Sequence, residues 1–309
     1  MTATEIETEK TISEYDMLIT DEIDFRVELR AMKTVEEDTP LDMPEHKATI
    51  RINPDGTKQP LWVVGSKYEV VDHREIIKHF AEALNKSDIE AEVDYKVYKG
   101  GCRIYSIFTL NNTYRVNGKT VKPFFALTTS HDGSLRVGFM MGAKLDKKRY
   151  ISIAKTLYGS SAKHTKGINI EKTLVALSKA LEVFTNDVIP MWERMDTVTL
   201  NPEQVKSLVD NAIKKKIISD RKARDLPFVR VDGKGKSAKI FGSSYASVWE
   251  VYTGIITEVS KVPEFKGATE ERAFWRNTDA SEYFTKMMAK GMDLLKKTTE
   301  TKEEESEDK

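Results

Sequence analysis

The stretch that decides the fold, Phe124 to Phe184, reads FFALTTSHDGSLRVGFMMGAKLDKKRYISIAKTLYGSSAKHTKGINIEKTLVALSKALEVF. Phe124–Thr129 and Leu135–Met141 are apolar runs rich in residues that favour strands. Between them, Ser130-His131-Asp132-Gly133-Ser134 contains Asp-Gly, a pair that tolerates the positive φ of a tight turn. The pattern predicts a β-hairpin, then a short helix at 149–158 and a long helix at 168–189.

Basic residues fill the two linkers on either side of the predicted short helix. Between Lys144 and Lys179 there are nine Lys and Arg residues and two acidic residues, with Tyr150, Tyr158 and His164 among them. Lysines and interleaved aromatic side chains are typical of surfaces that bind single-stranded nucleic acid, because they contact phosphates and stack on bases. A solvated charged surface explains the charge count equally well.

The formal net charge of zero hides a segregation of charge along the chain. Residues 1–49 hold fourteen acidic and five basic residues, a net charge of −9, and residues 298–309 hold six and two, a net charge of −4. The middle of the chain, 50–297, therefore carries +13. A basic body with acidic ends suits a nucleic-acid-binding protein whose ends compete for its own cationic surface.

The remaining composition favours a reducing compartment. Cys102 is the single cysteine, which leaves no intramolecular disulfide and no cysteine-rich zinc site. The first residues lack the basic and apolar regions of a signal peptide, and no window has the roughly 18 apolar residues of a membrane-spanning helix. We expect a cytoplasmic protein without a membrane partner.

The chain alternates between strand and helix patterns. Apolar residues at helical spacing predict a helix at 73–85, and Asn201-Pro202-Glu203 opens another helix. Further helices are expected at Tyr245–Val259, capped by Ser243 or Ser244, and at Thr278–Lys297. Strands are expected at 48–52, 61–64, 67–71, 92–98, 102–110, 113–116 and 120–121.

These patterns predict an α+β fold in which an antiparallel β-sheet with hairpins packs on a long helix and a mainly helical C-terminal half follows. The sheet would have about five or six strands, with Ile170–Val188 covering its apolar face. Four regions are expected: an acidic extended N-terminal arm at 1–47, an α+β core at 48–197, a helical region with a basic loop at 198–297, and a disordered acidic tail at 298–309.

Catalytic motifs are weak in this sequence. Ser130, His131 and Asp132 are the residue types of a hydrolase triad, but neighbours in one turn point in different directions. His131 is expected to be a turn residue bonded to backbone. The five histidines form no HxxxH pair, although a metal site assembled in space stays open.

Residues 232–237, DGKGKS, imitate the end of a phosphate-binding loop. Arg230 stands where that motif has its first glycine, and a side chain there obstructs the backbone path around a phosphate. A basic loop contacting a nucleic-acid backbone fits better. Lys163-His164-Thr165-Lys166, placed before a helix N-terminus, suits an anion such as a phosphodiester in the same way.

Several collinear pieces resemble a family of phage/plasmid-like proteins, a domain of unknown function found in phages and mobile elements. They are Val64–Val71 with the helix to Phe80, Gly100–Tyr105, the Ser130–Ser134 turn, Lys163–Thr165, and Trp249–Glu258. The segment after the hairpin departs from the family, because Met140–Leu157 lacks its Cys and Asn. A weaker, fold-level similarity to phage single-strand annealing proteins of the RecT and Erf kind implies strand annealing.

The sequence therefore predicts a single-stranded DNA-binding or annealing protein that acts in recombination or replication without a cofactor, as a ring- or filament-forming homo-oligomer. The alternatives are a non-catalytic protein-interaction or host-modulating factor that uses the acidic ends and the helix at 244–259, and a metal-dependent enzyme on nucleic acid. The expected DNA-binding residues are Lys144, Lys147, Lys148, Arg149, Tyr150, Tyr158, Lys163, His164, Lys166, Lys234, Lys236 and Lys239.

Overall fold

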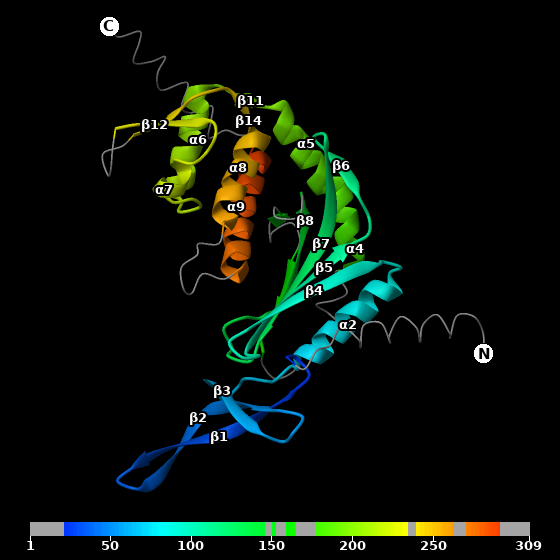
Figure 1. Ribbon diagram of the computed structural model, residues 1–309, viewed down its shortest axis with the longest axis vertical. Coiled ribbons are helices and arrows are strands. Elements are labelled where there is room, and N and C mark those ends of the chain that lie inside the picture. The colour runs from blue at the N-terminus through cyan, green and yellow to red at the C-terminus, as the bar shows by residue number, and fades with distance from the viewer. Residues whose placement is uncertain are drawn as a thin grey trace, which may run out of the picture. The chain divides into compact units, whose positions relative to one another are not determined.

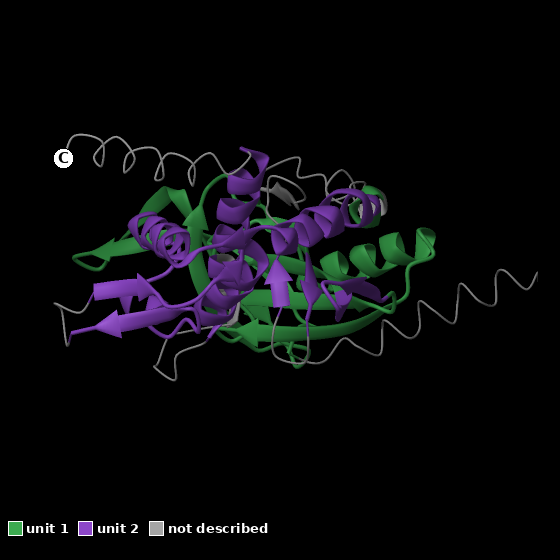
Figure 2. Cartoon of the chain, turned by 90° about the horizontal axis from the view of Figure 1, so that it is seen from above, with its two compact units in different colours: residues 1–112, 123–141, 159–181 green, residues 113–122, 142–158, 182–309 purple. Residues whose placement is uncertain are grey.

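The computed structural model describes residues 22–145, 150–152, 159–164, 177–233, 239–261 and 270–290, with backbone alone at 159–162, 177–178 and 270–275. The chain forms two compact units (Figure 2). Unit 1 holds residues 1–112, 123–141 and 159–181, and unit 2 holds 113–122, 142–158 and 182–309. These units alternate along the chain, unlike the consecutive regions expected from composition, because tertiary contacts rather than composition define them.

Unit 1 contains a three-stranded antiparallel sheet near its start (Figure 1). The strands are β1 (Arg26–Glu36), β2 (Thr39–Ile52) and β3 (Lys58–Gly65), in the order β1-β2-β3. Glu37 and Asp38 join β1 to β2 with φ of 46° and 65°, the conformation of a two-residue hairpin turn. The sequence predicted an extended arm up to residue 47, but residues 26–36 and 39–47 lie in paired strands, where most of the charged side chains are exposed.

The second sheet confirms the predicted hairpin. Its order is β10-β8-β7-β5-β4, with β6 and β9 pairing to β7 and β8. The strands are β4 (Ala91–Tyr98), β5 (Arg103–Leu110), β6 (Tyr114–Val116), β7 (Lys119–Ser130), β8 (Val137–Lys144), β9 (Tyr150–Ser152) and β10 (Gly159–Ala162). Seven strands form where five or six were expected, because β9 lies within the predicted short helix at 149–158 and β10 follows that predicted helix.

Helix α2 (His73–Lys86) covers the sheet within unit 1, and its predicted range of 73–85 is confirmed. The fully buried Phe80 lies with its ring 4.5 Å from that of Phe108 and 5.8 Å from that of Phe125, measured between centroids. The helix predicted at Ile170–Val188 was also expected to cover the sheet. In its described part, Phe184 packs on Tyr114 of β6 and on Trp192.

Unit 2 is mainly helical, as predicted for the C-terminal part of the chain. Residues 177–197 are helical throughout, as α4 (Leu177–Val183), a π-helical turn η1 (Phe184–Val188) and α5 (Ile189–Thr197). Helix α6 (Pro202–Lys214) starts where Asn201-Pro202 predicted, and the Asn201 and Gln204 side chains form a capping box. Residues 165–176, which the long helix was also expected to include, lie outside the described residues.

The rest of unit 2 differs from the predictions in local detail. Helix α8 (Val248–Ser260) is capped by Ser247 rather than by Ser243 or Ser244, because Glu250 completes a capping box with Ser247. Helix α9 (Glu270–Ala289) begins earlier than expected. Between α6 and α8, within the region where a basic loop was expected, the chain forms the short helix α7 (Asp220–Ala223) and a hairpin of β12 (Val229–Asp232) with β13 (Lys239–Gly242).

Two-residue strands β11 (Thr199–Leu200) and β14 (Ala246–Ser247) pair with each other in unit 2. Among the residues that the structure describes, no helix has the length and apolar content needed to cross a membrane.

Candidate functional site

Three histidines that are far apart in the sequence come together inside unit 1. His73 begins α2, His131 follows β7, and His164 follows β10. Their exposed fractions are 1%, 1% and 5%. The ring centroids of His73 and His131 lie 4.0 Å apart, and the ring of His164 stacks on that of Tyr68 at 5.1 Å. We call His73, His131 and His164 the histidine cluster.

Hydrogen bonds fix part of this cluster and leave part of it open. The Nε2–H group of His73 donates to the carbonyl of Gly101 at 2.9 Å, which leaves its Nδ1 as an unprotonated acceptor when the ring is neutral. The Nε2 of His164 lies 3.4 Å from the hydroxyl of Thr129. The Nδ1 atom of each of the three rings is buried and has no hydrogen-bond partner within the described part of the chain.

Burial keeps the three imidazoles neutral at physiological pH. Burial, with a smaller contribution from neighbouring imidazoles at His73 and His131, lowers the pKa of His73 to about 4, of His131 to about 2 and of His164 to about 4. Neutral imidazoles are metal ligands when they converge. Within the described ranges, however, no group of three or more His, Cys, Asp or Glu side chains is arranged to hold a metal ion.

The turn that carries His131 is anchored by its neighbours. The hydroxyl of Ser130 accepts from the Leu135 N–H at 3.0 Å, and the carboxylate of Asp132 accepts from the Arg103 Nε–H at 2.8 Å. Burial by itself would raise the pKa of Asp132, but hydrogen bonds from Ser134 and Arg103 lower it overall. The Ser130, His131 and Asp132 side chains thus have three different sets of partners, which is not the alignment of a triad.

A glycine lets the first strand of unit 1 approach this cluster. Gly101 has a φ of +94°, and a Cβ built on it would lie 2.6 Å from the ring of Phe25. The Phe25 ring in turn meets the rings of His73 and His131 edge-on, at centroid distances of 6.2 and 6.0 Å. A side chain at residue 101 would therefore force Phe25 away from the histidine cluster.

The predicted DNA-binding residues fall into two groups. Among those described, Lys163 and Lys239 are exposed and Lys144 and Tyr150 are half-buried. His164 is buried, so its ring could contact a nucleic acid only by leaving its stack on Tyr68. The predicted residues outside the described part of the chain are Lys147, Lys148, Arg149, Tyr158, Lys166, Lys234 and Lys236.

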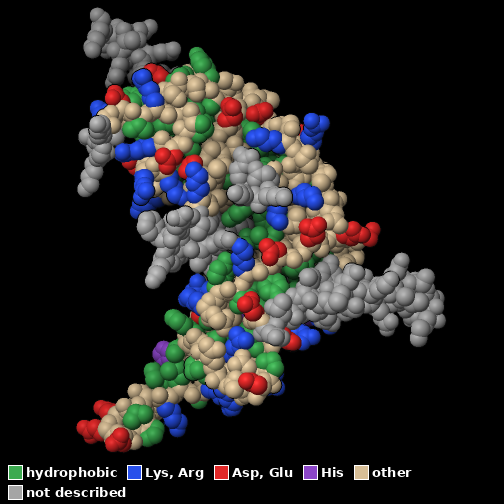
Figure 3. Space-filling view, viewed as in Figure 1, with side chains coloured by type: hydrophobic (Ala, Val, Ile, Leu, Met, Phe, Trp, Pro, Cys, Tyr) green, Lys and Arg blue, Asp and Glu red, His purple; other side chains and the backbone are tan. Residues whose placement is uncertain are grey.

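Exposed basic side chains gather on unit 2 around α6, α7 and the β12–β13 hairpin (Figures 1 and 3). We call this set the unit 2 basic surface: Lys214, Lys215, Lys216, Arg221, Arg230 and Lys239. The guanidinium of Arg230 lies 5.4 Å from the ring centroid of Phe241, and Tyr245, just beyond β13, is 70% exposed. Cations beside an exposed aromatic ring can bind phosphates and stack on a base.

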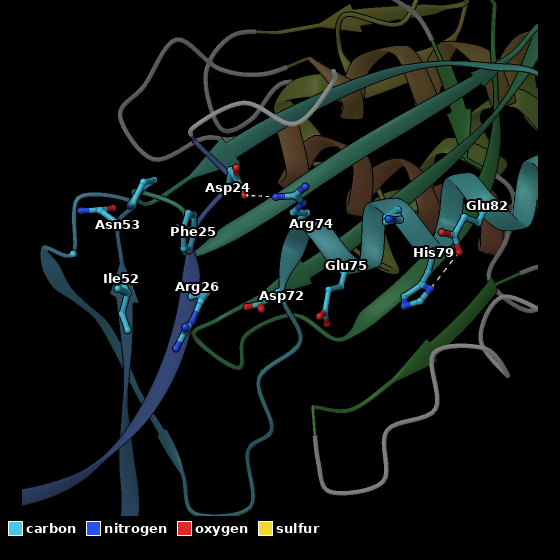
Figure 4. A pocket seen from close by; sticks show the side chains of 13 residues that line it. Asp24, Phe25, Arg26, Ile52, Asn53, Asp72, Arg74, Glu75, His79 and Glu82 are labelled. Carbon is cyan, nitrogen blue, oxygen red and sulfur yellow. Dashed lines mark hydrogen bonds and ion pairs between the residues drawn. The ribbon is translucent and has the colours of Figure 1, made fainter. Parts of the chain in front are cut away.

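A cleft of about 890 Å³ lies in unit 1 beside the first turns of α2 (Figure 4). Asp24, Asp72, Glu75 and Glu82 line it together with the basic side chains Arg26, Arg74 and Lys78. Many of these charges compensate one another: Arg74 pairs with Asp24 at 2.8 Å, and His79 lies 3.6 Å from Glu82. A cleft with balanced charge does not select for an anion such as phosphate.

The aromatic face of the helix predicted at 245–259 packs inside unit 2. Trp249 is 3% exposed and Tyr252 is 2% exposed, and their rings contact those of Trp192 and Phe284. Trp249 and Tyr252 are therefore core residues, whereas Tyr245, which lies before α8, is 70% exposed. A partner protein could not use Trp249 and Tyr252 without opening the helical core.

Sequence reasoning missed the histidine cluster and part of the basic surface. The histidines lie 58 and 33 positions apart, as their residue numbers 73, 131 and 164 show. No local spacing signals such a contact. The run Lys214–Lys216 was not singled out, although three consecutive lysines at the end of an amphipathic helix are a visible signal.

Comparison with known proteins gives one match. Residues 60–143 match the model of a protein family described as Domain of unknown function (DUF932). No curated protein and no solved structure matches the chain. The matched segment is a minority of the 309 residues and includes α2 and the strands β4 to β7, with His73 and His131 but not His164. Over residues 60–143 the chain is thus similar to a family of unknown function.

Proposed function

We propose that this protein binds single-stranded DNA through the unit 2 basic surface, and that it acts without a cofactor as a binding or strand-annealing factor in recombination or replication. The observation that carries the proposal is the cluster of exposed cations on unit 2, with the exposed Tyr245 three residues after β13 in the chain. Phosphate binding depends on summed Lys and Arg charge, and an exposed ring accepts a base of any sequence.

The cations of this surface are available to a ligand. Lys206, on α6 before them in the chain, lies in an ion pair with Asp210, and Arg224 lies in one with Asp220. Lys214, Lys215, Lys216 and Arg221 form no ion pair with any carboxylate in the described segments. A phosphate would therefore meet cations whose charge is not already neutralised by a neighbour.

The β12–β13 hairpin supports the same proposal, because it carries Lys239, one of the predicted DNA-binding residues. Lys239 begins β13 opposite Asp232, and Arg230 lies opposite Phe241. The hairpin therefore carries a cation and a partly exposed ring at paired positions. Close packing fixes its base, since a Cβ on Gly242 would lie 1.9 Å from the carbonyl oxygen of Pro202.

Fluorescence anisotropy of a labelled oligonucleotide at about 50 and 200 mM salt tests the proposal. Binding should be measurable at the lower concentration and should weaken steeply at the higher one, because released counterions oppose it. Replacing Lys214, Lys215 and Lys216 by alanine should reduce the slope of log K against log salt by about 0.7 for each phosphate that the variant no longer neutralises. Absence of binding at low salt would refute the proposal.

Two further variants separate a specific surface from general attraction. Lys206→Ala removes a cation that is already paired on the same helix, so its affinity should match that of the wild type. Tyr245→Ala should weaken binding by about 1–3 kcal/mol if a base stacks on the ring, with an unchanged salt slope. Mixing complementary labelled strands with the protein then distinguishes annealing from binding alone.

A further inference from the structure

The three-stranded sheet of unit 1 has two different edges. Its order places β1 at one edge and β3 at the other. Strand β3 has eight residues and contains Pro60, which cannot donate a ladder hydrogen bond. Strand β1 has eleven residues and no proline, and in the described ranges it pairs with β2 alone. A long edge strand of this kind is a template for another strand.

The backbone groups of alternate β1 residues point away from β2. Glu36 and Thr39 flank a two-residue turn, and such a flanking pair is hydrogen-bonded, so the even-numbered residues of β1 face β2. The N–H of Val27 accordingly points outward, where it donates to the carboxylate of Asp72. The open part of the edge consists of Leu29, Ala31, Lys33 and Val35.

The side chains of β1 are complementary to a second β1 strand in the antiparallel direction. With Ala31 opposite Ala31, Arg26 faces Glu36 and Val27 faces Val35, by counting along the strand. The Val27 N–H stays bonded to Asp72, so the new backbone hydrogen bonds come from Leu29, Ala31 and Lys33. Val35 is 67% exposed, whereas Val27 is 9% exposed, so at each end of the pairing an exposed valine would lie beside one that is already buried. Glu28 would face Thr34 and Leu29 would face Lys33, so no like charges stand directly opposite each other.

We propose that two copies of this chain associate through the β1 edge, antiparallel and centred on Ala31, so that the two three-stranded sheets form one six-stranded sheet. The contact is isologous: each pair, such as Arg26 with Glu36 of the second copy, occurs twice across the two-fold axis, and Ala31 meets Ala31 on the axis itself. Backbone hydrogen bonds supply the attraction, as in other cases of strand addition, and the Arg26 and Glu36 charges set the register. This contact does not depend on nucleic-acid binding.

A cysteine cross-link tests the register. Ala31→Cys places two thiols opposite each other at the two-fold axis, within the Cα separation that a disulfide spans. The native Cys102 is buried, which leaves the new thiol as the reactive one. Mild oxidation should convert this variant to a covalent dimer at least ten times faster than it converts Asp55→Cys, a control in the exposed β2–β3 turn. Equal rates for the two variants would refute the proposal.

Sedimentation analysis tests the pairing without a cross-link. The wild type should form a species of twice the 35.2 kDa chain mass, and Ala31→Pro should raise the dimer dissociation constant at least tenfold, because it removes an outward N–H and leaves the β2 ladder intact. Arg26→Glu and Glu36→Arg should each weaken the dimer, and the double variant should restore it. A monomeric wild type, or a dimer that survives all of these changes, would overturn the inference.

Discussion

Each unit contains a buried polar site, and the two sites differ in how far their polar atoms are hydrogen-bonded. In unit 2, the side chain of Asn277 accepts from the Ser152 N–H at 2.8 Å and donates to the Tyr150 carbonyl at 2.7 Å and the Ser260 hydroxyl at 2.8 Å. In unit 1, the histidine cluster leaves three Nδ1 atoms without a partner in the described residues. The first site has a fixed charge of zero, and the second is neutral only while the pH is high enough.

These two sites should therefore respond to different perturbations. A buried amide whose hydrogen bonds are satisfied links the strand β9 to helices α8 and α9 and gives no response to pH. Buried imidazoles held neutral by desolvation respond to acid, since protonation places a charge in an interior where desolvation outweighs the attraction of Asp132 for His164. Substitution at neutral pH should consequently lower the stability most at Asn277, whereas acid should lower it most at the histidine cluster.

Lowering the pH should cause the largest loss of stability, and the loss should occur in unit 1. Each cluster histidine has a folded-state pKa below the ordinary 6.5, so the unfolded state binds more protons as the pH falls below that value. Their contribution to the free energy of unfolding is complete above about pH 6.5. It falls as the pH decreases toward 4, and the loss is about 2 kcal/mol for each histidine at pH 5. Protection factors from hydrogen exchange should fall at the His131 amide between about pH 7 and 5.

The Ser152 amide is the matched control for this experiment, because it donates to Asn277 in a site without a titratable group. Its protection, corrected for the intrinsic pH dependence of exchange, should change much less than that of His131. Equal losses at the two amides would show that the acid response is global and does not come from the histidine cluster.

Substitution of Asn277 should cause the second-largest loss of stability, and the loss should occur in unit 2. Asn277→Ala removes all three hydrogen bonds and leaves the buried Ser152 N–H without its acceptor. We expect a loss of about 3 kcal/mol in the free energy of unfolding at neutral pH, measured by urea denaturation. Asn211→Ala, on helix α6 with a half-buried side chain, is the control and should cost less than about 1 kcal/mol.

At the histidine cluster, His131→Leu should have little effect on stability at neutral pH and a clear effect on its pH dependence. The change removes the ring whose burial lowers its pKa the most and leaves an apolar side chain among Phe25 and the other imidazoles. At neutral pH the stability should change by about 1 kcal/mol or less, whereas the loss between about pH 7 and 5 should shrink by roughly a third. A pH profile parallel to that of the wild type would contradict the neutral-imidazole assignment.

The smallest effect is expected at the edge of the cluster. The hydroxyl of Tyr68 donates to the Ser130 carbonyl at 2.7 Å, and its ring stacks on His164. Tyr68→Phe keeps the stack and removes one buried hydrogen bond, so the free energy of unfolding should fall by about 1 kcal/mol with the pH profile unchanged. Tyr68→Leu, which also removes the stack, should cost more.

Local patterns were enough to predict much of the fold. The Asp-Gly turn predicted the β7–β8 hairpin, helical spacing predicted α2, and Asn201-Pro202 predicted the start of α6. These elements depend on residues close together in the chain, where turn chemistry and capping act directly. Residues 150–152 were predicted as helix and form β9, because pairing with β8 outweighs local propensity.

The sequence by itself determined the segregation of charge, the hairpin at Ser130–Ser134 and the aromatic face of α8. These properties need no knowledge of distant contacts. Tertiary structure alone decided that His73, His131 and His164 share one interior, that residues 26–52 pair instead of forming an extended arm, and that β1 has an open edge. The physical reason is that burial and strand pairing join residues tens of positions apart, and no local pattern encodes those contacts.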